Sequence, residues 1–345
     1  MVATILVEDA LTVNNAVFID TRSPKEFAED HIPHAVNIPI LSNEERAVVG
    51  TLYKQVSQDK GLEVGMEFYR KNTPSILAAV EQHKTKTLLI YCWRGGLRSK
   101  TIAELFASLG YAVFQVQGGY KSYREYVRKR LSNYTLHSRL IVLYGLTGTG
   151  KTELLQHFSH SIDLEALAGH RGSVYGGIGL QQHSQKKFEN LLLQRLEALH
   201  MQKYIIVEGE SKRIGDVFIP EFFFSAMEQG IKILVQRSFD KRIAYSTATY
   251  CNTEEKTKEF LAITHNLRKN ISNATKQTII TALEKKDVHT ALSVLFKEYY
   301  DPLYSHYLDT LSYAFRINTD EIEEGIRQLK NFIHQYSQQF LHSVQ

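Results

Sequence analysis

The sequence predicts an α/β protein that consists of two successive α/β domains and a C-terminal helical subdomain. Short apolar, β-rich runs alternate with helix-like segments in the first third of the chain and again in its middle. A length of 345 residues suits two domains, each large enough to bury its own core. After about residue 240, glycine and proline become scarce and the hydrophobic period approaches 3.6 residues, which is typical of helices.

The first domain is expected over residues 1–132. Its predicted strands and helices alternate along the chain: Ala16–Asp20, Pro24–Asp30, Leu88–Tyr91, Ser99–Leu109 and Ala112–Val116. Gly118 and Gly119 then precede a basic amphipathic helix, Tyr120–Leu131, which leads out of the domain. The domain boundary is therefore placed between residues 132 and 139.

The second α/β domain is expected over residues 139–240 and the helical subdomain over residues 241–345. The second domain is predicted to contain strands at Leu140–Tyr144, Tyr204–Glu208 and Lys232–Gln236, with a helix from about Lys151. The predicted helices of the subdomain include Thr278–Lys285, Val288–Tyr300 and Glu321–Gln339. The first part of this subdomain is basic, since residues 231–280 hold nine Lys and Arg against four Asp and Glu.

The composition excludes several classes of protein. With 43% hydrophobic and 23% charged residues, the chain resembles an average globular protein and not a disordered one. Its apolar runs are no longer than strands, so no membrane span is expected, and the N-terminus lacks the basic and apolar regions of an export signal. We therefore expect a cytoplasmic protein. Cys92 and Cys251 lie far apart without metal-binding neighbours, which predicts reduced thiols and no zinc site.

Cys92 is the first candidate catalytic residue. It directly follows an apolar strand, and Gly95 and Gly96 separate it from the next helix. In such a turn, backbone N–H groups and the helix N-terminus converge on one point and create an anion-binding site that also favours a thiolate. Arg94 and Arg98 add positive charge. The pattern predicts a nucleophile or chalcogen carrier, the alternative being an inert buried cysteine.

Residues 145–152, GLTGTGKT, form the second candidate site. They match the phosphate-binding P-loop motif, follow an apolar strand and open a helix. Its glycines allow N–H groups to surround a diphosphate, Lys151 would neutralise the charge, and Thr152 with Glu208 would hold Mg²⁺. The predicted phosphate-binding residues are Gly145, Gly148, Gly150, Lys151, Thr152, Arg171, Ser173, Glu208 and Arg213.

Two further patterns resemble known families. The segments IDTRSPKEF (residues 19–27) and DHIPHAVNIP (residues 30–39), upstream of Cys92, resemble the rhodanese family over about residues 1–130. The resemblance implies a sulfurtransferase-like domain in which Cys92 carries sulfur or selenium. The loop from Cys92 to Arg98 has the spacing Cys-x5-Arg, which cysteine phosphatases also use, and is longer than in most sulfur-transferring rhodaneses. It is therefore expected to accept a larger anion.

The rhodanese-like domain joined to a P-loop domain resembles the bacterial tRNA 2-selenouridine synthase family. The resemblance rests on CWRGGLRS (residues 92–99), HRGS (170–173), VEGESKRIG (207–215) and YYDPLY (299–304). It implies conversion of wobble 2-thiouridine to 2-selenouridine with selenophosphate, through an S-geranyl intermediate made from geranyl diphosphate. Lys151 would then stabilise the departing pyrophosphate, Arg94 and Arg98 would bind selenophosphate, and Cys92 would receive selenium or attack during the exchange.

The partners implied are tRNA, selenophosphate and geranyl diphosphate, with no tightly bound cofactor. The basic helix around residues 121–130 and the stretch 241–276 supply cations for tRNA, unless they are solvated helix faces. The candidate tRNA-binding residues are Trp93, Lys121, Arg124, Arg128, Lys241 and Arg242. Trp93 would stack on the wobble base or pack within the domain. Phe222, Phe223 and Phe224 form either a slot for the geranyl chain or part of the core.

Three alternative functions remain open from the sequence. The first is an ATP-dependent phosphotransferase or ATPase with a regulatory rhodanese-like domain, against which Glu208 at the metal position argues. The second is a cysteine phosphatase, which would leave the P-loop domain without a role. The third is a non-catalytic RNA-binding scaffold, whose tRNA affinity would not depend on Cys92 or Lys151.

Overall fold

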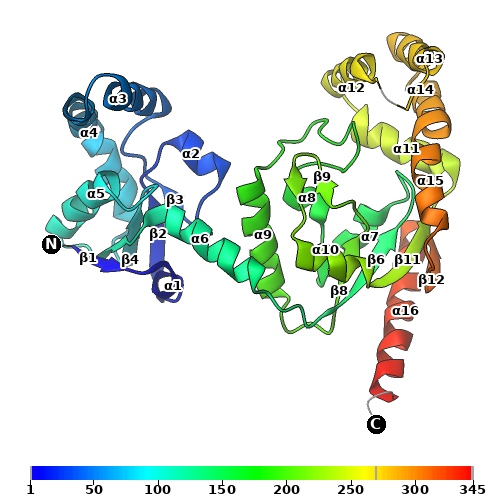
Figure 1. The fold of residues 1–345 in the computed structure, drawn as a ribbon, viewed down its shortest axis with the longest axis horizontal. Helices are drawn as coiled ribbons and strands as arrows, with labels where there is room; N and C mark the ends of the chain where they lie inside the picture. Colours follow the sequence, from blue (N-terminus) through cyan, green and yellow to red (C-terminus); the bar gives the residue numbers. More distant parts are fainter. Residues whose placement is uncertain (1, 269, 343–345) are drawn as a thin grey trace. The chain divides into compact units, whose positions relative to one another are not determined.

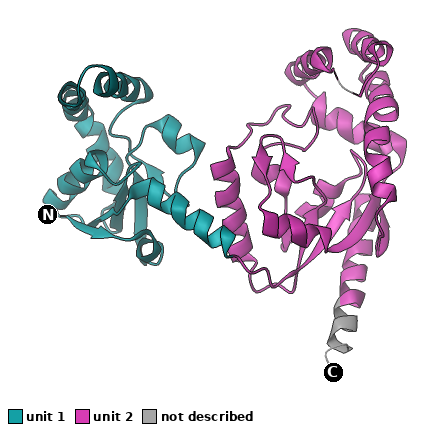
Figure 2. Cartoon of the chain, in the orientation of Figure 1, with its two compact units in different colours: residues 1–133 teal, residues 134–345 magenta. Residues whose placement is uncertain are grey.

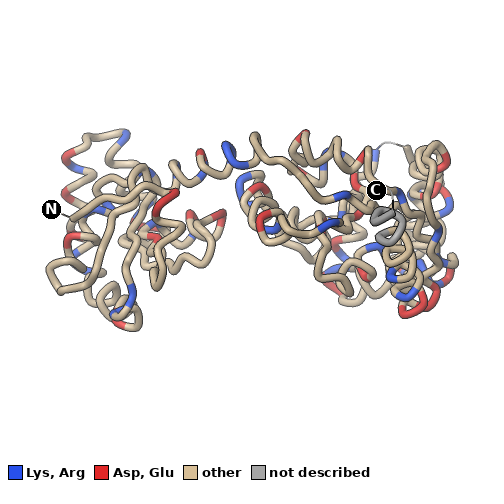
Figure 3. Tube along the Cα trace, turned by 90° about the horizontal axis from the view of Figure 1, so that it is seen from below, with Lys and Arg blue, Asp and Glu red and all other residues tan. Residues whose placement is uncertain are grey.

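The computed structural model describes residues 2–268 and 270–342 and divides into two compact units, residues 1–133 and 134–345 (Figures 1 and 2). Among the described residues, no helix is both long enough and apolar enough to cross a membrane. Basic and acidic residues are interspersed along both units (Figure 3).

The first unit is built on a parallel five-stranded sheet with the order β1-β5-β4-β2-β3. The strands are β1 (Ala3–Ile5), β2 (Ala16–Asp20), β3 (Val36–Asn37), β4 (Thr87–Tyr91) and β5 (Val113–Val116). The helices are α1 (Val7–Ala10), α2 (Pro24–Glu29), α3 (Asn43–Gln55), α4 (Gln58–Val80), α5 (Leu97–Ser108) and α6 (Gly119–Ser132). The predicted strands and helices are confirmed, whereas β1, β3, α1, α3 and α4 were not predicted from the sequence.

Local sequence explains where several of these helices begin. The side chain of Ser23 caps α2 and that of Ser42 caps α3, each in a reciprocal capping box with the glutamate three residues later. The apolar faces of the sheet and helices meet in one core that includes Ile19, Ile90 and Phe106. The carboxyl ends of β2 and β4, where parallel strands commonly present functional groups, carry Asp20 and Cys92.

The second unit has a parallel five-stranded sheet with the order β12-β11-β6-β8-β7. The strands are β6 (Arg139–Tyr144), β7 (Ser161–Ile162), β8 (Tyr204–Glu208), β11 (Ile231–Gln236) and β12 (Phe315–Asn318), with a separate hairpin of β9 (Arg213–Ile214) and β10 (Val217–Phe218). The helices around the sheet are α7 (Lys151–Gln156), α8 (Leu164–Ala168), α9 (Gln185–Ala198), α10 (Glu221–Glu228) and α16 (Ile322–His342). The three predicted strands are confirmed.

The predicted helical region forms part of the second unit and contains a strand that the prediction missed. Its helices are α11 (Phe239–Tyr250), α12 (Glu254–Asn266), α13 (Asn273–Glu284), α14 (Val288–Leu295), a π-helical turn (Phe296–Tyr300) and α15 (Asp301–Asp309). They enclose a core that includes Phe260, Leu295 and Phe296. After α15 the chain returns to the sheet as β12, which pairs with β11. The region after residue 240 is therefore not wholly helical.

Candidate active sites

The loop after β4 holds Cys92 in a tight turn that only glycine permits at two positions. Gly95 has a φ of +64°, and a Cβ atom there would lie 2.8 Å from the carbonyl oxygen of Val116. Gly119, at the start of α6, approaches the loop so closely that a Cβ atom would lie 2.3 Å from the carbonyl oxygen of Cys92. The glycines thus allow α6 to pack directly on the cysteine loop.

Hydrogen bonds from two elements fix the cysteine loop. The N–H of Tyr120 donates to the carbonyl of Cys92 at 2.8 Å, and the N–H of Lys121 donates to the carbonyl of Trp93 at 2.9 Å. From β5, the side-chain amide of Gln115 donates to the carbonyl of Gly95 at 2.8 Å. The loop is therefore held in one shape before any substrate arrives, as a preorganised anion site requires.

The thiol of Cys92 is almost buried, with 3% of the residue exposed. Its sulfur lies 3.3 Å from the hydroxyl oxygen of Ser99, which also accepts a hydrogen bond from the Gln115 side chain at 2.9 Å. The Ser99 hydroxyl itself donates to the carbonyl of Gly96 at 3.1 Å, so Ser99 joins the cysteine to the backbone of its loop. Ser99 was not proposed as a site residue from the sequence, although it directly follows Arg98 in the quoted motif.

Both predicted arginines line the same cavity as Cys92, but Arg98 is already paired. Its guanidinium donates to the Glu26 carboxylate at 2.9 Å. Burial by itself would raise the pKa of Glu26, but the charge and hydrogen bond of Arg98 outweigh burial and the pKa lies below its ordinary value. Glu26 therefore fixes Arg98 at the entrance of the loop as an ion pair.

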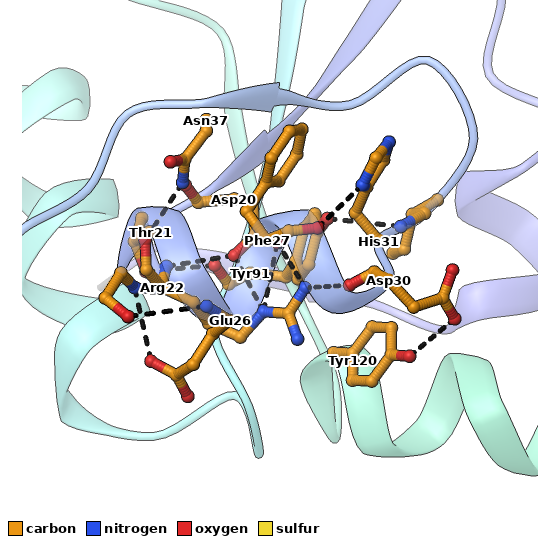
Figure 4. Close-up of polar contacts among 12 residues, drawn as sticks. Asp20, Thr21, Arg22, Glu26, Phe27, Asp30, His31, Asn37, Tyr91 and Tyr120 are labelled. Carbon is orange, nitrogen blue, oxygen red and sulfur yellow. Dashed lines mark hydrogen bonds and ion pairs between the residues drawn. The ribbon is translucent and has the colours of Figure 1, made fainter. Parts of the chain in front are cut away.

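A buried polar network joins the end of β2, the residues on either side of α2, and α6 (Figure 4). Arg22 is 1% exposed and binds the Asp20 carboxylate, with its closest contact at 2.6 Å. It also donates to the carbonyl of Asp30 at 2.7 Å and lies 4.0 Å from the ring centroid of Tyr120. The Tyr120 hydroxyl in turn donates to the Asp30 carboxylate at 2.6 Å. The network thereby fixes the start of α6 and, through it, the cysteine loop.

Replacing Arg22 with alanine should destabilise the first unit strongly. The Asp20 carboxylate, which is 0% exposed, would be left buried without its partner, and breaking such a pair costs about 3–5 kcal/mol. Urea unfolding monitored by tryptophan fluorescence would measure the loss of unfolding free energy, because the chain has one tryptophan, Trp93, in this unit. Arg70→Ala, on an exposed position of α4, is the control. A loss no larger than in the control would contradict the role of the network.

The P-loop after β6 has the geometry of a phosphate cradle. A Cβ atom at Gly145 would lie 2.4 Å from the carbonyl oxygen of Val235, and Gly150 has a φ of +81° where α7 begins. The Lys151 ammonium donates to the carbonyls of Gly145 and Leu146 at 2.9 and 3.3 Å. Lys151 thus lies across its own loop, at the position where it would meet the outer phosphate of a ligand.

Residues from distant parts of the chain support the P-loop. Thr319, after β12, donates to the carbonyl of Thr149 at 2.7 Å. Arg242, on α11, donates to the carbonyl of Thr147 at 2.9 Å and forms a bidentate pair with Asp301 at 2.5 and 3.0 Å. Arg242 is only 4% exposed, so its predicted role in tRNA binding is corrected: it positions the P-loop. Asp301, in the quoted motif of residues 299–304, is its anchor.

Three carboxylates gather beside the P-loop. One oxygen each from Glu165, Glu208 and Glu210 lies within 4.8 Å of the others, and the Thr152 hydroxyl donates to Glu208 at 3.3 Å. Burial, together with the neighbouring carboxylates, raises the pKa of Glu165 and of Glu210 to about 8 and that of Glu208 well above its ordinary value. Oxygen ligands of this kind suit Mg²⁺.

The metal candidates predicted from the sequence, Thr152 and Glu208, are therefore together, and Glu165 and Glu210 join them. Glu210 lies two residues beyond Glu208, within the quoted motif. It is close to the site because β8 ends at Glu208. Glu165 lies at the start of α8, 43 residues before Glu208 in the sequence. Its backbone N–H donates a hydrogen bond to the Glu208 carboxylate. No pattern in the sequence singles it out.

A cavity of about 510 Å³ extends from the P-loop and has two kinds of wall. The polar wall includes Lys151, Arg171, Ser173 and Glu210. Its aromatic and apolar lining is formed by Tyr144, Phe224, Tyr245, Tyr250, Tyr304, Tyr307 and Leu308. Of the three predicted phenylalanines, Phe224 lines the cavity, whereas Phe223 is fully buried in the core.

Arg213 does not belong to this cavity, contrary to the prediction. Its guanidinium pairs with Asp216 at 3.0 Å and donates to the carbonyl of Gly215, so it stabilises the β9–β10 hairpin. The neighbouring Lys212 lines the cavity instead and also pairs with Glu221. The two cations are adjacent in the sequence, and only the contacts of Arg213 within the hairpin separate their positions.

The predicted tRNA-binding residues differ in exposure. Lys121, Arg128 and Lys241 are exposed, with Lys121 paired to Glu125 at 3.4 Å. Arg124 is only 6% exposed, so it does not belong to an exposed basic surface, and that prediction is corrected. Trp93 is half-buried, lines the cavity at Cys92 and packs against Tyr120 with 5.4 Å between ring centroids.

Comparisons with known proteins agree with this division of the chain. Residues 138–277 match the profile described as the tRNA 2-selenouridine synthase AAA domain, and residues 6–126 match the rhodanese-like domain. A tRNA 2-selenouridine synthase from Pseudomonas syringae pv. syringae (strain B728a) is 31% identical over 329 residues, covering 86% of this chain and 90% of the relative.

Two further relatives match shorter parts. A tRNA 2-selenouridine synthase from Nitrosomonas europaea is 36% identical over 245 residues, which cover 68% of this chain and 63% of that relative, less than two thirds of its length. The crystal structure of the N-terminal domain of a putative ATP/GTP binding protein from Clostridium difficile 630 is 36% identical, with a TM-score of 0.35, and covers 36% of this chain and 98% of that domain.

Proposed function

The chain belongs to the tRNA 2-selenouridine synthase family, and we propose that its units carry two successive steps that convert wobble 2-thiouridine of tRNA to 2-selenouridine. In this proposal, the P-loop unit transfers a geranyl group to sulfur, and the rhodanese-like unit exchanges the alkylated sulfur for selenium. The observation that carries the proposal is the P-loop cavity, which is lined both by phosphate-binding residues and by aromatic side chains.

The P-loop cavity suits geranyl diphosphate in both parts of that molecule. The backbone of the P-loop and Lys151 would bind the diphosphate, while Phe224 and Tyr304 offer apolar surface to the chain. The sulfur of 2-thiouridine attacks C1 of the geranyl group, the C1–O bond breaks, pyrophosphate leaves, and the N3 proton of the base is released. Lys151 stabilises the charge that develops on the departing oxygen.

Mg²⁺ would be held by Thr152, Glu165, Glu208 and Glu210 in this proposal. The fit rests on the oxygen ligands and on their buried, mutually repelling charges, which a divalent cation would compensate. When bound, the ion would neutralise charge on the diphosphate.

The stability of the metal-free protein should depend on pH. Without metal, folded Glu165 and Glu210 keep their protons to about pH 8, whereas an ordinary glutamate releases its proton near 4.5. The folded state then binds more protons than the unfolded chain, so stability should fall as the pH rises from about 4.5 to 8. Because Mg²⁺ replaces these protons, the increase in Tm that it causes should be larger above pH 8 than near pH 6.

Differential scanning calorimetry in EDTA and in Mg²⁺ would measure these differences. The double variant Glu165→Gln, Glu210→Gln should have a smaller pH slope, since only Glu208 remains, and should lose the Mg²⁺ effect, whereas Glu284→Gln, at an exposed position, should keep both. An Mg²⁺ effect that is equal at both pH values, or that survives in the double variant, would contradict a metal site at these carboxylates.

Cys92 would act at C2 of the geranylated base. Its thiolate attacks C2, the C2–S bond to the geranyl group breaks, and geranyl thiolate leaves and takes a proton from water. Selenium of selenophosphate, bound by Arg94 and Arg98, then attacks C2 and regenerates the Cys92 thiolate, and hydrolysis of the Se–P bond releases phosphate. No electrons are exchanged. A perselenide on Cys92 would need a two-electron oxidant to form from selenophosphate and a reductant to release the selenium afterwards, so we favour attack at C2.

Mass spectrometry of nucleosides tests the proposed function. The purified protein is incubated with tRNA that contains wobble 2-thiouridine, first with geranyl diphosphate alone and then with selenophosphate added. We expect S-geranyl-2-thiouridine in the first reaction and 2-selenouridine in the second. If neither nucleoside forms and the protein hydrolyses ATP at a rate independent of Cys92, the phosphotransferase or ATPase alternative replaces the proposal.

A further inference from the structure

The cavity at Cys92 is larger and more apolar than selenophosphate requires. It measures about 660 Å³, and the cysteine loop forms only one side of it. The other sides come from the segment before α3 and from α3 and α4, which contribute Leu41, Val49, Leu62 and Met66. Its cations are Arg94 and Arg98 of the loop and Arg46 and Lys54 of α3. Selenophosphate would pair with these cations and would leave the apolar lining without an occupant.

Glycines in α3 and α4 keep the apolar part hollow. Gly50, Gly61 and Gly65 all line the cavity although each lies inside a helix, where glycine costs about 0.5–1 kcal/mol relative to alanine. Gly61 is needed for helix packing, because a Cβ atom there would lie 2.9 Å from the Cα of Tyr53. At Gly65 the nearest atom to such a Cβ would be a methyl group of Val49 at 3.7 Å, which is an ordinary contact. Packing therefore does not require glycine at position 65.

We propose that this cavity binds the geranyl chain of S-geranyl-2-thiouridine while C2 of the base lies at Cys92, which makes it a second prenyl-binding site, separate from the P-loop cavity. The inference rests on the proposed function and identifies the group that the exchange site recognises. The group that must leave from C2 is geranyl thiolate, and its ten-carbon chain has to lie beside the nucleophile. The apolar walls extend from that position.

Binding of the chain would position the reacting atoms. Apolar contact with Leu62 and Met66 would hold the sulfur next to Cys92, so that the Cys92–C2 bond forms as the C2–S bond to the geranyl group breaks. Geranyl thiolate would then take a proton from water and leave as the thiol. A fully buried carbon contributes roughly a fourfold gain in binding. The site should therefore select geranylated over short-chain bases.

The test uses RNA that is already alkylated, so that the P-loop reaction is bypassed. Anticodon stem-loops carrying S-methyl-, S-dimethylallyl- or S-geranyl-2-thiouridine are incubated with the full chain and selenophosphate, and kcat/KM for selenium incorporation is measured. For the unaltered protein we expect geranyl to exceed dimethylallyl by at least about tenfold, and dimethylallyl to exceed methyl, because more apolar surface is buried.

Variants of the cavity separate binding of the chain from general damage. Gly65→Leu fills the apolar part, and Leu62→Gln makes an exposed part of its wall polar; each should lower kcat/KM for the geranyl substrate by about tenfold and for the methyl substrate by less than about threefold. Val48→Gln is the matched control, since Val48 is an exposed residue of α3 that does not line the cavity. Trp93 fluorescence and Tm establish that each variant is folded.

The outcomes distinguish this inference from the proposed function. If the unaltered protein converts all three substrates with equal kcat/KM, or if the variants affect methyl and geranyl substrates equally, the prenyl-binding site is overturned and the proposed function stands. If the unaltered protein converts none of the alkylated RNAs, both are overturned. Geranylation by the P-loop unit should be unchanged in both cavity variants, which excludes a general loss of active protein.

Discussion

Replacing Cys92 with alanine should abolish formation of 2-selenouridine and leave formation of S-geranyl-2-thiouridine unchanged. In the proposed exchange, the variant lacks the thiolate that would attack C2, and removal of a nucleophile typically lowers the rate by on the order of 10³-fold or more. The preorganised loop around it remains, because its hydrogen bonds come from the backbone and from Gln115. Single-turnover assays with geranylated RNA and selenophosphate, followed by nucleoside mass spectrometry, would measure the difference.

Cys251→Ala is the matched control for this variant. Cys251 is the other free cysteine, lies in the second unit, and has a pKa raised to about 11, mainly by burial. Its loss should leave both products unchanged. Selenium incorporation that persists in Cys92→Ala would remove Cys92 from the reaction, and a loss of geranylation in the same variant would show that the two steps are not divided between the units.

Replacing Lys151 with alanine should lower geranylation by roughly 10²–10³-fold, the usual cost of removing a group that stabilises developing charge. Lys151 lies across the P-loop and its ammonium has no hydrogen-bonded carboxylate partner among the described residues, unlike Arg242, which is paired with Asp301, so pyrophosphate would leave without its main counterion. The rate of geranyl transfer to 2-thiouridine-containing RNA at saturating geranyl diphosphate measures this effect. The same variant should still form 2-selenouridine from RNA that is already geranylated.

Lys203→Ala, at an exposed position just before β8, controls for a simple loss of positive charge. It should geranylate RNA at the unaltered rate. Two results would contradict the assignment of Lys151: geranylation at full rate in Lys151→Ala, or loss of selenium incorporation from geranylated RNA in that variant. The second result would place both steps in one site.

The parts of the sites that the sequence predicted are those encoded by short contiguous motifs. Cys92, its glycines and the P-loop around Lys151 each lie between a strand and a helix, and this local order determines the turn. Ser99, which contacts Cys92, lies in the same motif and could have been predicted in the same way. Glu165 was not, because only the return of the chain through β7 brings it to Glu208, and one acidic residue in a helix start has no distinctive pattern.

Clusters of basic residues in the sequence were the least reliable basis for predicting binding residues. Arg124 and Arg242 lie in basic segments that look like RNA-binding helices, yet both are buried, and Arg242 is paired with Asp301. A helix presents residues on all its faces, so a run of cations does not say which of them meets solvent. The strand β12 was missed for a related reason: four residues between two helices give too short a pattern to outweigh their surroundings.

The position of β12 in the chain affects the order in which the second unit is completed during synthesis. A ribosome releases residues 139–236, with four of the five strands, long before Phe315–Asn318 emerges. Until then β11 is an open edge, and Thr149 lacks the hydrogen bond from Thr319. A nascent chain would therefore carry a complete P-loop sequence without its final support. We expect competence to bind diphosphate to appear only after the last strand has joined the sheet, so that translation itself times the activation of the enzyme.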